Sequence, residues 1–125
     1  MKLLLDSHAF LWWDRRDRRL DKAAAAAIAD GNNQVFISAA TVWELAIKRA
    51  AGKIKYPKSI AANIAANGFD PLAISPQHGE MAASLPAHHR DPFDRLLVAQ
   101  ATLEGCVLVT HDRQIEPYGV PCLWT

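Results

Sequence analysis

Two aspartates follow apolar runs that are typical of buried strands. Asp6 comes directly after Leu3–Leu5, and Asp112 comes two residues after Val107–Thr110. The carboxyl ends of parallel strands share one edge of a sheet, and ligands of open α/β sheets bind outside that edge. The two aspartates are therefore candidates for a common ligand site.

Three more acids lie in or at the starts of expected helices. Glu44 is about one and a half turns into the helical stretch 39–50, and Asp91 and Asp94 share one side of a helix that opens at Pro92. Converging carboxylates repel one another unless a cation neutralises them, so such a cluster is suited to a hard divalent cation. Oxygen ligands favour Mg²⁺ or Mn²⁺, and a site of this kind activates water for displacement at phosphorus.

Helix capping is the alternative explanation for each of these acids. Asp6, Asp91 and Asp112 each precede a helix start, where an aspartate accepts hydrogen bonds from free backbone N–H groups. The stretch Thr41–Glu44 matches a capping box, in which Glu44 only reaches back to a backbone donor. Both interpretations stay open, because spacing does not show whether the side chains converge.

The elements that must position these acids alternate along the chain. Short apolar runs indicate strands, and periodicity near 3.6 residues with strong helix formers indicates helices. The expected strands are 2–5, 34–38, 70–74, 107–110 and 120–124. The expected helices are 7–13, 22–29, 39–50, 59–66, 75–85 and 91–103, and the charged stretch 14–21 is expected to be an exposed turn or a frayed helix end. This order predicts an α/β fold with a mostly parallel central sheet covered on both faces.

Length and composition bound the class of protein. A chain of 125 residues, half of it hydrophobic, is expected to form one domain over 1–125 with its own core. The net charge of +1 does not by itself call for a nucleic-acid partner. No apolar stretch approaches the ~18 residues of a membrane span, and the start is not expected to act as a secretion signal. Cys106 and Cys122 are expected to be reduced thiols of a cytosolic protein.

Four stretches of the chain match the motifs of one known family, in that family's order. They are Leu3–His8, Ile37–Lys48, Asp91–Ala101 and Val109–Asp112. In these stretches the sequence resembles PIN-domain proteins, specifically the VapC-type toxins of bacterial toxin–antitoxin pairs. The resemblance implies a three-layer α/β/α sandwich with the acids around one groove. It assigns the catalytic and metal-binding positions to Asp6, Glu44, Asp94 and Asp112, with Asp91 and Thr110 as additional candidates.

The resemblance also implies an activity and partners. Members of this family are Mg²⁺- or Mn²⁺-dependent endoribonucleases that cut RNA, often tRNA or rRNA. It implies a cytoplasmic homodimer inhibited by a cognate VapB-like antitoxin whose tail lies across the groove. Two other classes stay open: a Mg²⁺-dependent phosphatase or phosphotransferase of a doubly wound fold, and a non-catalytic RNA- or protein-binding module. The lack of a second acid just after Asp6 disfavours the phosphatase, and the presence of all four acids disfavours the binding module.

Two groups of basic residues are candidates for contacts with RNA. Phosphate contacts would give a salt-dependent affinity, and the alternative is an ordinary solvated surface. Arg95 either steadies a phosphate or an acid, or forms an ion pair on the surface. The histidines match no structural zinc spacing, although His88 and His89 lie beside Asp91. The two basic groups are Lys48, Arg49, Lys53, Lys55 and Lys58, and Arg15, Arg16, Arg18 and Arg19.

Overall fold

The computed structural model describes residues 1–125 and is built around a five-stranded sheet in which every neighbouring pair is parallel. The strands lie in the order β3-β2-β1-β4-β5. They are β1 (Lys2–Leu5), β2 (Gln34–Ser38), β3 (Asp70–Leu72), β4 (Val107–Thr110) and β5 (Cys122–Trp124). The fold class predicted from the alternating pattern is confirmed.

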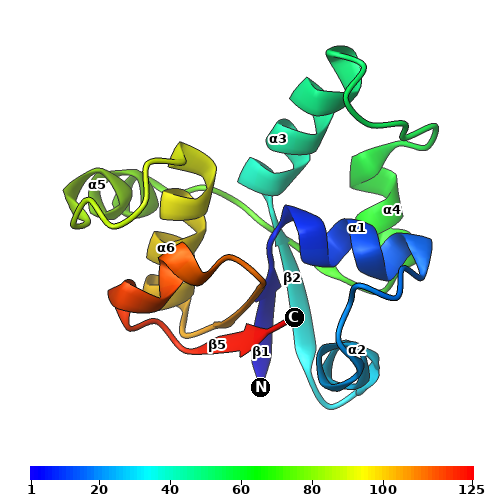
Figure 1. Ribbon diagram of the computed structural model, residues 1–125, viewed down its shortest axis with the longest axis horizontal. Helices are drawn as coiled ribbons and strands as arrows, with labels where there is room; N and C mark the ends of the chain where they lie inside the picture. The colour runs from blue at the N-terminus through cyan, green and yellow to red at the C-terminus, as the bar shows by residue number, and fades with distance from the viewer.

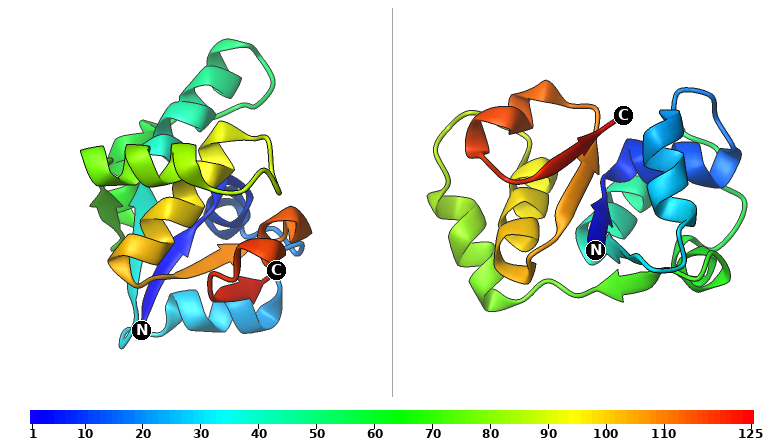
Figure 2. Two further views of the ribbon diagram at one scale, coloured as in Figure 1. Left: turned by 90° about the vertical axis from the view of Figure 1, so that its left-hand side faces the viewer. Right: turned by 90° about the horizontal axis from the view of Figure 1, so that it is seen from below.

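Helices cover both faces of the sheet (Figures 1 and 2). On one face lie α1 (Ser7–Arg15), α2 (Lys22–Ala29), α3 (Ala39–Ala50) and α4 (Ile60–Ala66). On the other face lie α6 (Pro92–Glu104) and the short 3₁₀ helix η1 (Arg113–Tyr118), with α5 (Pro76–Ser84) packed against α6. Side chains alternate across β1, so Leu3 and Leu5 join the first core cluster and Leu4 joins the second. The result is the predicted three-layer sandwich.

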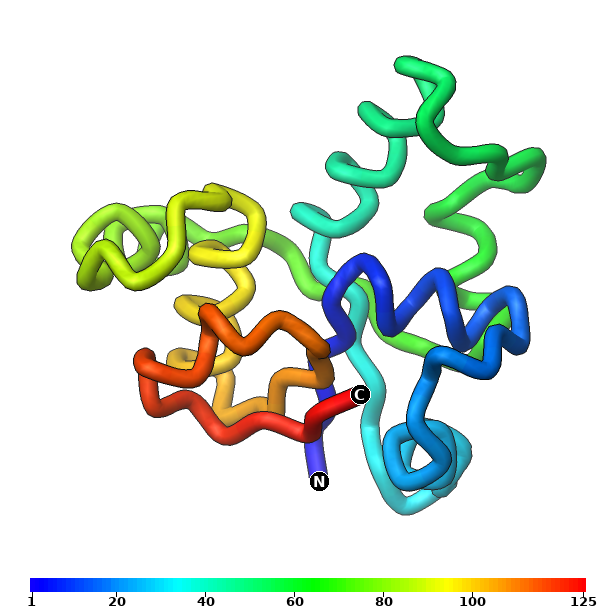
Figure 3. The backbone as a smooth tube through the Cα atoms, in the orientation of Figure 1, coloured from blue at the N-terminus to red at the C-terminus, as the bar shows by residue number.

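The carboxyl ends of β1 and β4 form the edge of the sheet at which the predicted site residues lie. The strand order reverses at β1, because β2 and β3 lie on one side of it and β4 and β5 on the other. The backbone N–H of Asp6 donates to the carbonyl of Val109 at 3.0 Å, so the ends of the two strands are in contact. Beyond this edge the chain runs from β1 into α1 on one side and from β4 into η1 on the other (Figure 3). Such a reversal opens a crevice where ligands bind in α/β sheets.

The predicted element bounds depart from the structure mainly at the ends. α1 continues to Arg15 and therefore includes Asp14, whose carboxylate accepts hydrogen bonds from Asn63 at 2.5 Å and Tyr56 at 3.3 Å. Leu20 is buried in the core. The expectation of an exposed segment over 14–21 is wrong at these positions, because contacts to α4 and the sheet-side core hold them. β3 and β5 are each two residues shorter than predicted.

The two cysteines are unpaired thiols within the fold. Cys106 is buried and Cys122 is half-buried. Burial raises the pKa of both thiols, to about 11 for Cys122. Because the thiolate is the reactive form, this environment keeps both side chains unreactive near neutral pH. None of the helices combines the length and the apolar character that crossing a bilayer requires.

Candidate metal centre

A small polar cavity lies at the carboxyl ends of β1 and β4. Its volume is about 180 Å³, and no hydrophobic residue lines it. The walls come from the β1–α1 junction, α3, the start of α6, the segment before α6 and the end of β4. All four acids predicted as site residues are in this wall. The lining residues are Asp6, Ser7, His8, Glu44, Lys48, His89, Asp91, Asp94, His111 and Asp112.

Asp6 is both a helix cap and a wall of the cavity. Its side chain is almost fully buried, and Oδ1 accepts the backbone N–H of Ala9 at 2.8 Å, which caps α1. Burial raises the pKa of the carboxyl, and the Ala9 hydrogen bond opposes that rise. Capping occupies one carboxylate oxygen only. The capping and metal-binding interpretations of Asp6 are therefore compatible.

The capping-box interpretation of Thr41–Glu44 is wrong. The helix starts directly after Ser38, whose hydroxyl accepts a backbone N–H at 3.0 Å and is the actual N-cap. Glu44 therefore lies too far along α3 to reach a free backbone donor. Its carboxylate instead accepts a hydrogen bond from the hydroxyl of Ser7, and its Oε2 lies 3.6 Å from Nζ of Lys48. These contacts keep the Glu44 side chain at the cavity.

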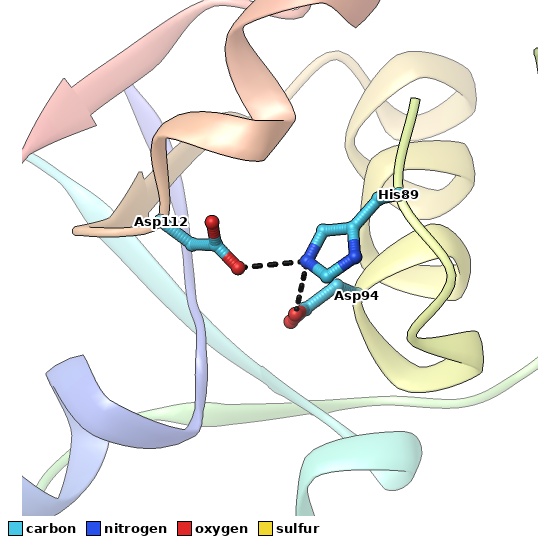
Figure 4. A group of neighbouring side chains, drawn as sticks. All are labelled: His89, Asp94 and Asp112. Carbon is cyan, nitrogen blue, oxygen red and sulfur yellow. Dashed lines mark hydrogen bonds and ion pairs between the residues drawn. The ribbon is translucent and has the colours of Figure 1, made fainter. Parts of the chain in front are cut away.

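The tightest contacts in the cavity join Asp94, Asp112 and His89 (Figure 4). Nε2 of His89 lies 2.7 Å from Oδ2 of Asp112 and 3.0 Å from Oδ2 of Asp94. One possible ligand atom from each of the three lies within 4.8 Å of the others. Asp6 and Glu44 line the same cavity but are outside this group. His89 was not among the predicted site residues, and only its place just before the Asp91 motif pointed to it.

The charges in the cavity favour a bound cation. Burial, followed by repulsion from Asp91 and Asp6, raises the pKa of Asp94 to about 7. Burial also acts to raise the pKa of Asp112, but hydrogen bonds from the Gln114 N–H and from His89 outweigh it and lower that pKa. Five carboxylates and a single lysine line the cavity. Because oxygen donors dominate and their mutual repulsion is only partly neutralised, the residues present fit a hard divalent cation.

Asp91 and Thr110, the two additional candidates, act on the backbone around the cavity. Oδ1 of Asp91 caps α6 by accepting the N–H groups of Phe93 at 2.8 Å and Asp94 at 3.3 Å. Thr110 is fully buried, and its hydroxyl accepts the N–H of Asp112 at 3.1 Å. The capping interpretation of Asp91 is confirmed. These two residues fix the backbone that presents Asp94 and Asp112.

The guanidinium of Arg95 forms no ion pair with an acid of the cavity or of the surface, so those two interpretations drawn from the sequence are wrong. It donates instead to main-chain carbonyls of residues 82–89, which form the end of α5 and the segment that leads from α5 to the cavity. Five N–H donors in a rigid fork suit the free carbonyls at the end of a helix. The accepting carbonyls include those of Ala82, Leu85, Pro86 and His89, at 2.8, 2.9, 3.0 and 3.3 Å.

Replacing Arg95 with lysine is expected to destabilise the fold. A single ammonium cannot reach several carbonyls in the geometry of the guanidinium, so the free energy of unfolding should fall by about 2 kcal/mol. Urea unfolding followed by circular dichroism measures this change. Arg90→Lys is the matched control, because Arg90 lies exposed in the neighbouring segment. Equal stability of Arg95→Lys and wild type would show that these hydrogen bonds do not hold the segment.

The chain matches known proteins in sequence and in fold. A model of the PIN domain matches residues 3–120. Ribonuclease VapC22 from Mycobacterium tuberculosis is 32% identical over 127 residues, which cover 95% of this chain and 93% of the relative. The crystal structure of VapBC2 from Rickettsia felis bound to a promoter DNA fragment gives a TM-score of 0.73 at 15% identity, covering 100% of this chain and 99% of that one. A toxin–antitoxin complex from Klebsiella pneumoniae gives a TM-score of 0.61 at 20% identity, and the match covers 88% of this chain and 86% of that one.

Proposed function

Because this chain belongs to the PIN domain family, we propose that it is a metal-dependent endoribonuclease and the toxin of a type II toxin–antitoxin pair. The observation that carries the proposal is the single cavity lined by the four acids at the carboxyl ends of β1 and β4. Support also comes from the relative named a ribonuclease, which aligns over nearly the full length of both chains. In this proposal residues 1–125 act as one nuclease domain.

The acids of the cavity have defined roles in this proposal. Asp6, Glu44, Asp94 and Asp112 hold Mg²⁺ or Mn²⁺. Such a cation, when bound, stabilises negative charge at phosphorus and favours deprotonation of an attacking water. The Ala9 N–H orients Asp6, and the Ser7 hydroxyl orients Glu44.

Lys48 is the one lysine in the cavity wall. Its ammonium lies 3.6 Å from Glu44 and its side chain is about one-third exposed, so it can reach both the acids and an entering phosphate. A positive charge placed beforehand beside a scissile phosphate stabilises the charge that develops there. We assign Lys48 to binding and orienting that phosphate.

The toxin role requires a partner. We propose a VapB-like antitoxin and a homodimer of this chain, as the family resemblance implies. The solved toxin–antitoxin complex from Klebsiella pneumoniae contains a chain of the same fold, which supports a protein partner. A doubly wound phosphatase, one of the alternatives, receives no support from the family match over residues 3–120.

Cleavage of RNA by the purified protein tests the proposed activity. Total RNA, with separate tRNA and rRNA fractions, is incubated with Mg²⁺ or Mn²⁺, with EDTA, and with the Asp94→Asn variant. We expect cleavage only by the wild-type protein with metal. Equal cleavage in all reactions would point to a contaminant or another site. No cleavage of any fraction would contradict the proposed ribonuclease activity and would favour a non-catalytic binding module.

Besides Lys48, the basic segment 48–58 has two lysines free for phosphate contacts. It forms the end of α3 and the loop beyond it, on the side away from α2 (Figure 1). Arg49 donates to the carbonyls of Tyr56 and Lys58, and Lys58 lies 3.7 Å from Asp14, so both basic side chains stabilise the loop. Lys53 and Lys55 are exposed. In the second basic group, Arg15 donates to the Lys55 carbonyl and Arg19 pairs with Asp17.

The double variant Lys53→Ala/Lys55→Ala is expected to weaken RNA binding mainly at low salt. Each lost phosphate contact should reduce the slope of log affinity against log salt by about 0.7 for a single strand. Fluorescence anisotropy with a catalytically inactive Asp94→Asn background measures the slope. Lys22→Ala, an exposed lysine on α2, is the control. An unchanged slope in the double variant would remove this segment from the RNA-binding surface.

A further inference from the structure

The imidazole of His89 is a non-acidic group held between two acids of the cavity, and the proposed function gives it no role. Its side chain is only 9% exposed. Nε2 faces Asp112 at 2.7 Å and Asp94 at 3.0 Å (Figure 4). From this position His89 is either a nitrogen ligand for a cation or a hydrogen-bond donor to the two carboxylates. The ring nitrogen that carries the proton decides between these roles.

The hydrogen bond at Nδ1, the other ring nitrogen, shows which nitrogen carries the proton. The backbone N–H of Asp91 donates to Nδ1 of His89 at 3.2 Å. A ring nitrogen that accepts a hydrogen bond carries no hydrogen itself, so the neutral ring bears its proton on Nε2. Nε2–H then points at carboxylate oxygens of Asp112 and Asp94, which are acceptors. The opposite tautomer would set two N–H groups against each other and a lone pair against the carboxylates.

The backbone of His89 is held from outside the cavity, which keeps the ring in this orientation. Its N–H donates to the hydroxyl of Tyr118 at 3.0 Å, and that hydroxyl donates to the carbonyl of Pro86 at 2.7 Å. Arg95 donates to the carbonyl of His89 at 3.3 Å. Turning the ring by a half turn would put a carbon in the place of each nitrogen, so it would break the contact with Asp91 as well as those with Asp94 and Asp112.

We propose that His89 is a positioning residue of this centre, whose Nε2–H bridges Asp94 and Asp112 and holds their carboxylates for a divalent cation without ligating it. The bridge joins two elements, since Asp94 lies on α6 and Asp112 caps η1. It also offsets repulsion between two neighbouring carboxylates. Outer hydrogen-bond partners of metal ligands are worth about 10- to 100-fold in metal affinity. The inference rests on the proposed metal-dependent function.

Mn²⁺ binding to three forms of the full chain tests this assignment. His89→Gln keeps an amide N–H donor near the place of Nε2 and is a poor metal ligand, whereas His89→Ala removes the donor. By electron paramagnetic resonance titration, we expect His89→Ala to bind Mn²⁺ about 10- to 100-fold more weakly and His89→Gln to bind close to wild type. His88→Ala, an exposed histidine of the same segment, is the matched control and should bind like wild type.

Spectroscopy of the wild-type protein gives a test that does not depend on the variants folding. Electron spin echo modulation of bound Mn²⁺ should show no coupling to an imidazole ¹⁴N. In the metal-free protein, ¹⁵N NMR should show an unprotonated Nδ1 and a protonated Nε2 in the neutral His89 ring.

Each contrary result has a distinct meaning. Imidazole ¹⁴N coupling in wild type, with Mn²⁺ affinity lost in both His89 variants, would make His89 a ligand and overturn the inference while the metal-dependent function stands. Wild-type affinity in His89→Ala would overturn it too, since no bridge would be needed. Failure of the wild-type protein to bind Mn²⁺ would contradict the proposed function itself, and the inference with it.

Discussion

Asp6→Asn is expected to lower metal-dependent RNA cleavage by at least about 100-fold, as loss of a charge-stabilising group does in other enzymes. The metal-free protein should be as stable as wild type or more stable. Asparagine keeps the oxygen that accepts the Ala9 N–H, so the cap of α1 is retained. The substitution removes a carboxylate that is only 3% exposed and whose pKa is raised by burial. It also relieves repulsion on Asp94.

Two measurements separate catalysis from capping at Asp6. Single-turnover RNA cleavage with Mg²⁺ reports the activity, and urea unfolding in EDTA reports the stability. Asp21→Asn is the matched control, because Asp21 is an exposed aspartate that caps α2 through the Ala23 N–H at 3.0 Å. Asp6→Ala should lose activity and also about 1 kcal/mol of stability through the lost cap. Full activity with a large loss of stability in Asp6→Asn would make Asp6 a cap only.

The affinity for Mg²⁺ or Mn²⁺ is expected to rise about tenfold per pH unit up to about pH 7 and to level off above it. Burial and the neighbouring Asp91 and Asp6 carboxylates raise the pKa of Asp94 to about 7. A proton on Asp94 competes with the cation below that pH. RNA cleavage at subsaturating metal should follow the same profile.

The stability of the metal-free protein should depend on pH in the opposite sense. The pKa of Asp94 is raised from its ordinary 3.8, so the folded protein keeps a proton that the unfolded chain releases. This contribution to stability is fully present below about pH 4 and is lost as pH rises through about 7. Urea unfolding in EDTA between these values measures it. Asp94→Asn should flatten the profile, and Asp21→Asn should not. A stability difference between wild type and Asp94→Asn that stays the same across this range would contradict the raised pKa of Asp94.

Local patterns were sufficient for the order of strands and helices and for the aspartate caps at Asp6, Asp91 and Asp112, but not for the cap of α3, which is Ser38. Apolar runs marked β1 and β4, and the aspartates that follow them lie at the expected edge of the sheet. The spacing left helix capping and convergence on a metal site as alternatives for Asp6. Both are possible at once, because a carboxylate has two oxygens and the cap uses only one of them. The family motifs added the class of activity, which composition and periodicity do not contain.

Other features arise from contacts between residues that are distant in the chain. Glu44 is held by Ser7, 37 residues away, rather than by its own helix end. His89 meets Asp112 across 23 residues. The Arg95 guanidinium donates to carbonyls of the preceding segment and forms no ion pair with an acid. No periodicity marks these pairs, because their members lie in different elements and loops that only packing brings together.

The sequence by itself determined a layered α/β fold, its strand-end aspartates and the aspartate caps of three helices, because these depend on interactions within a few residues or on the two periodicities of strand and helix. Tertiary structure alone decided that five carboxylates share one cavity, and that an imidazole stands between Asp94 and Asp112. It also decided the pKa of Asp94, since that depends on burial and on charges brought close from other elements.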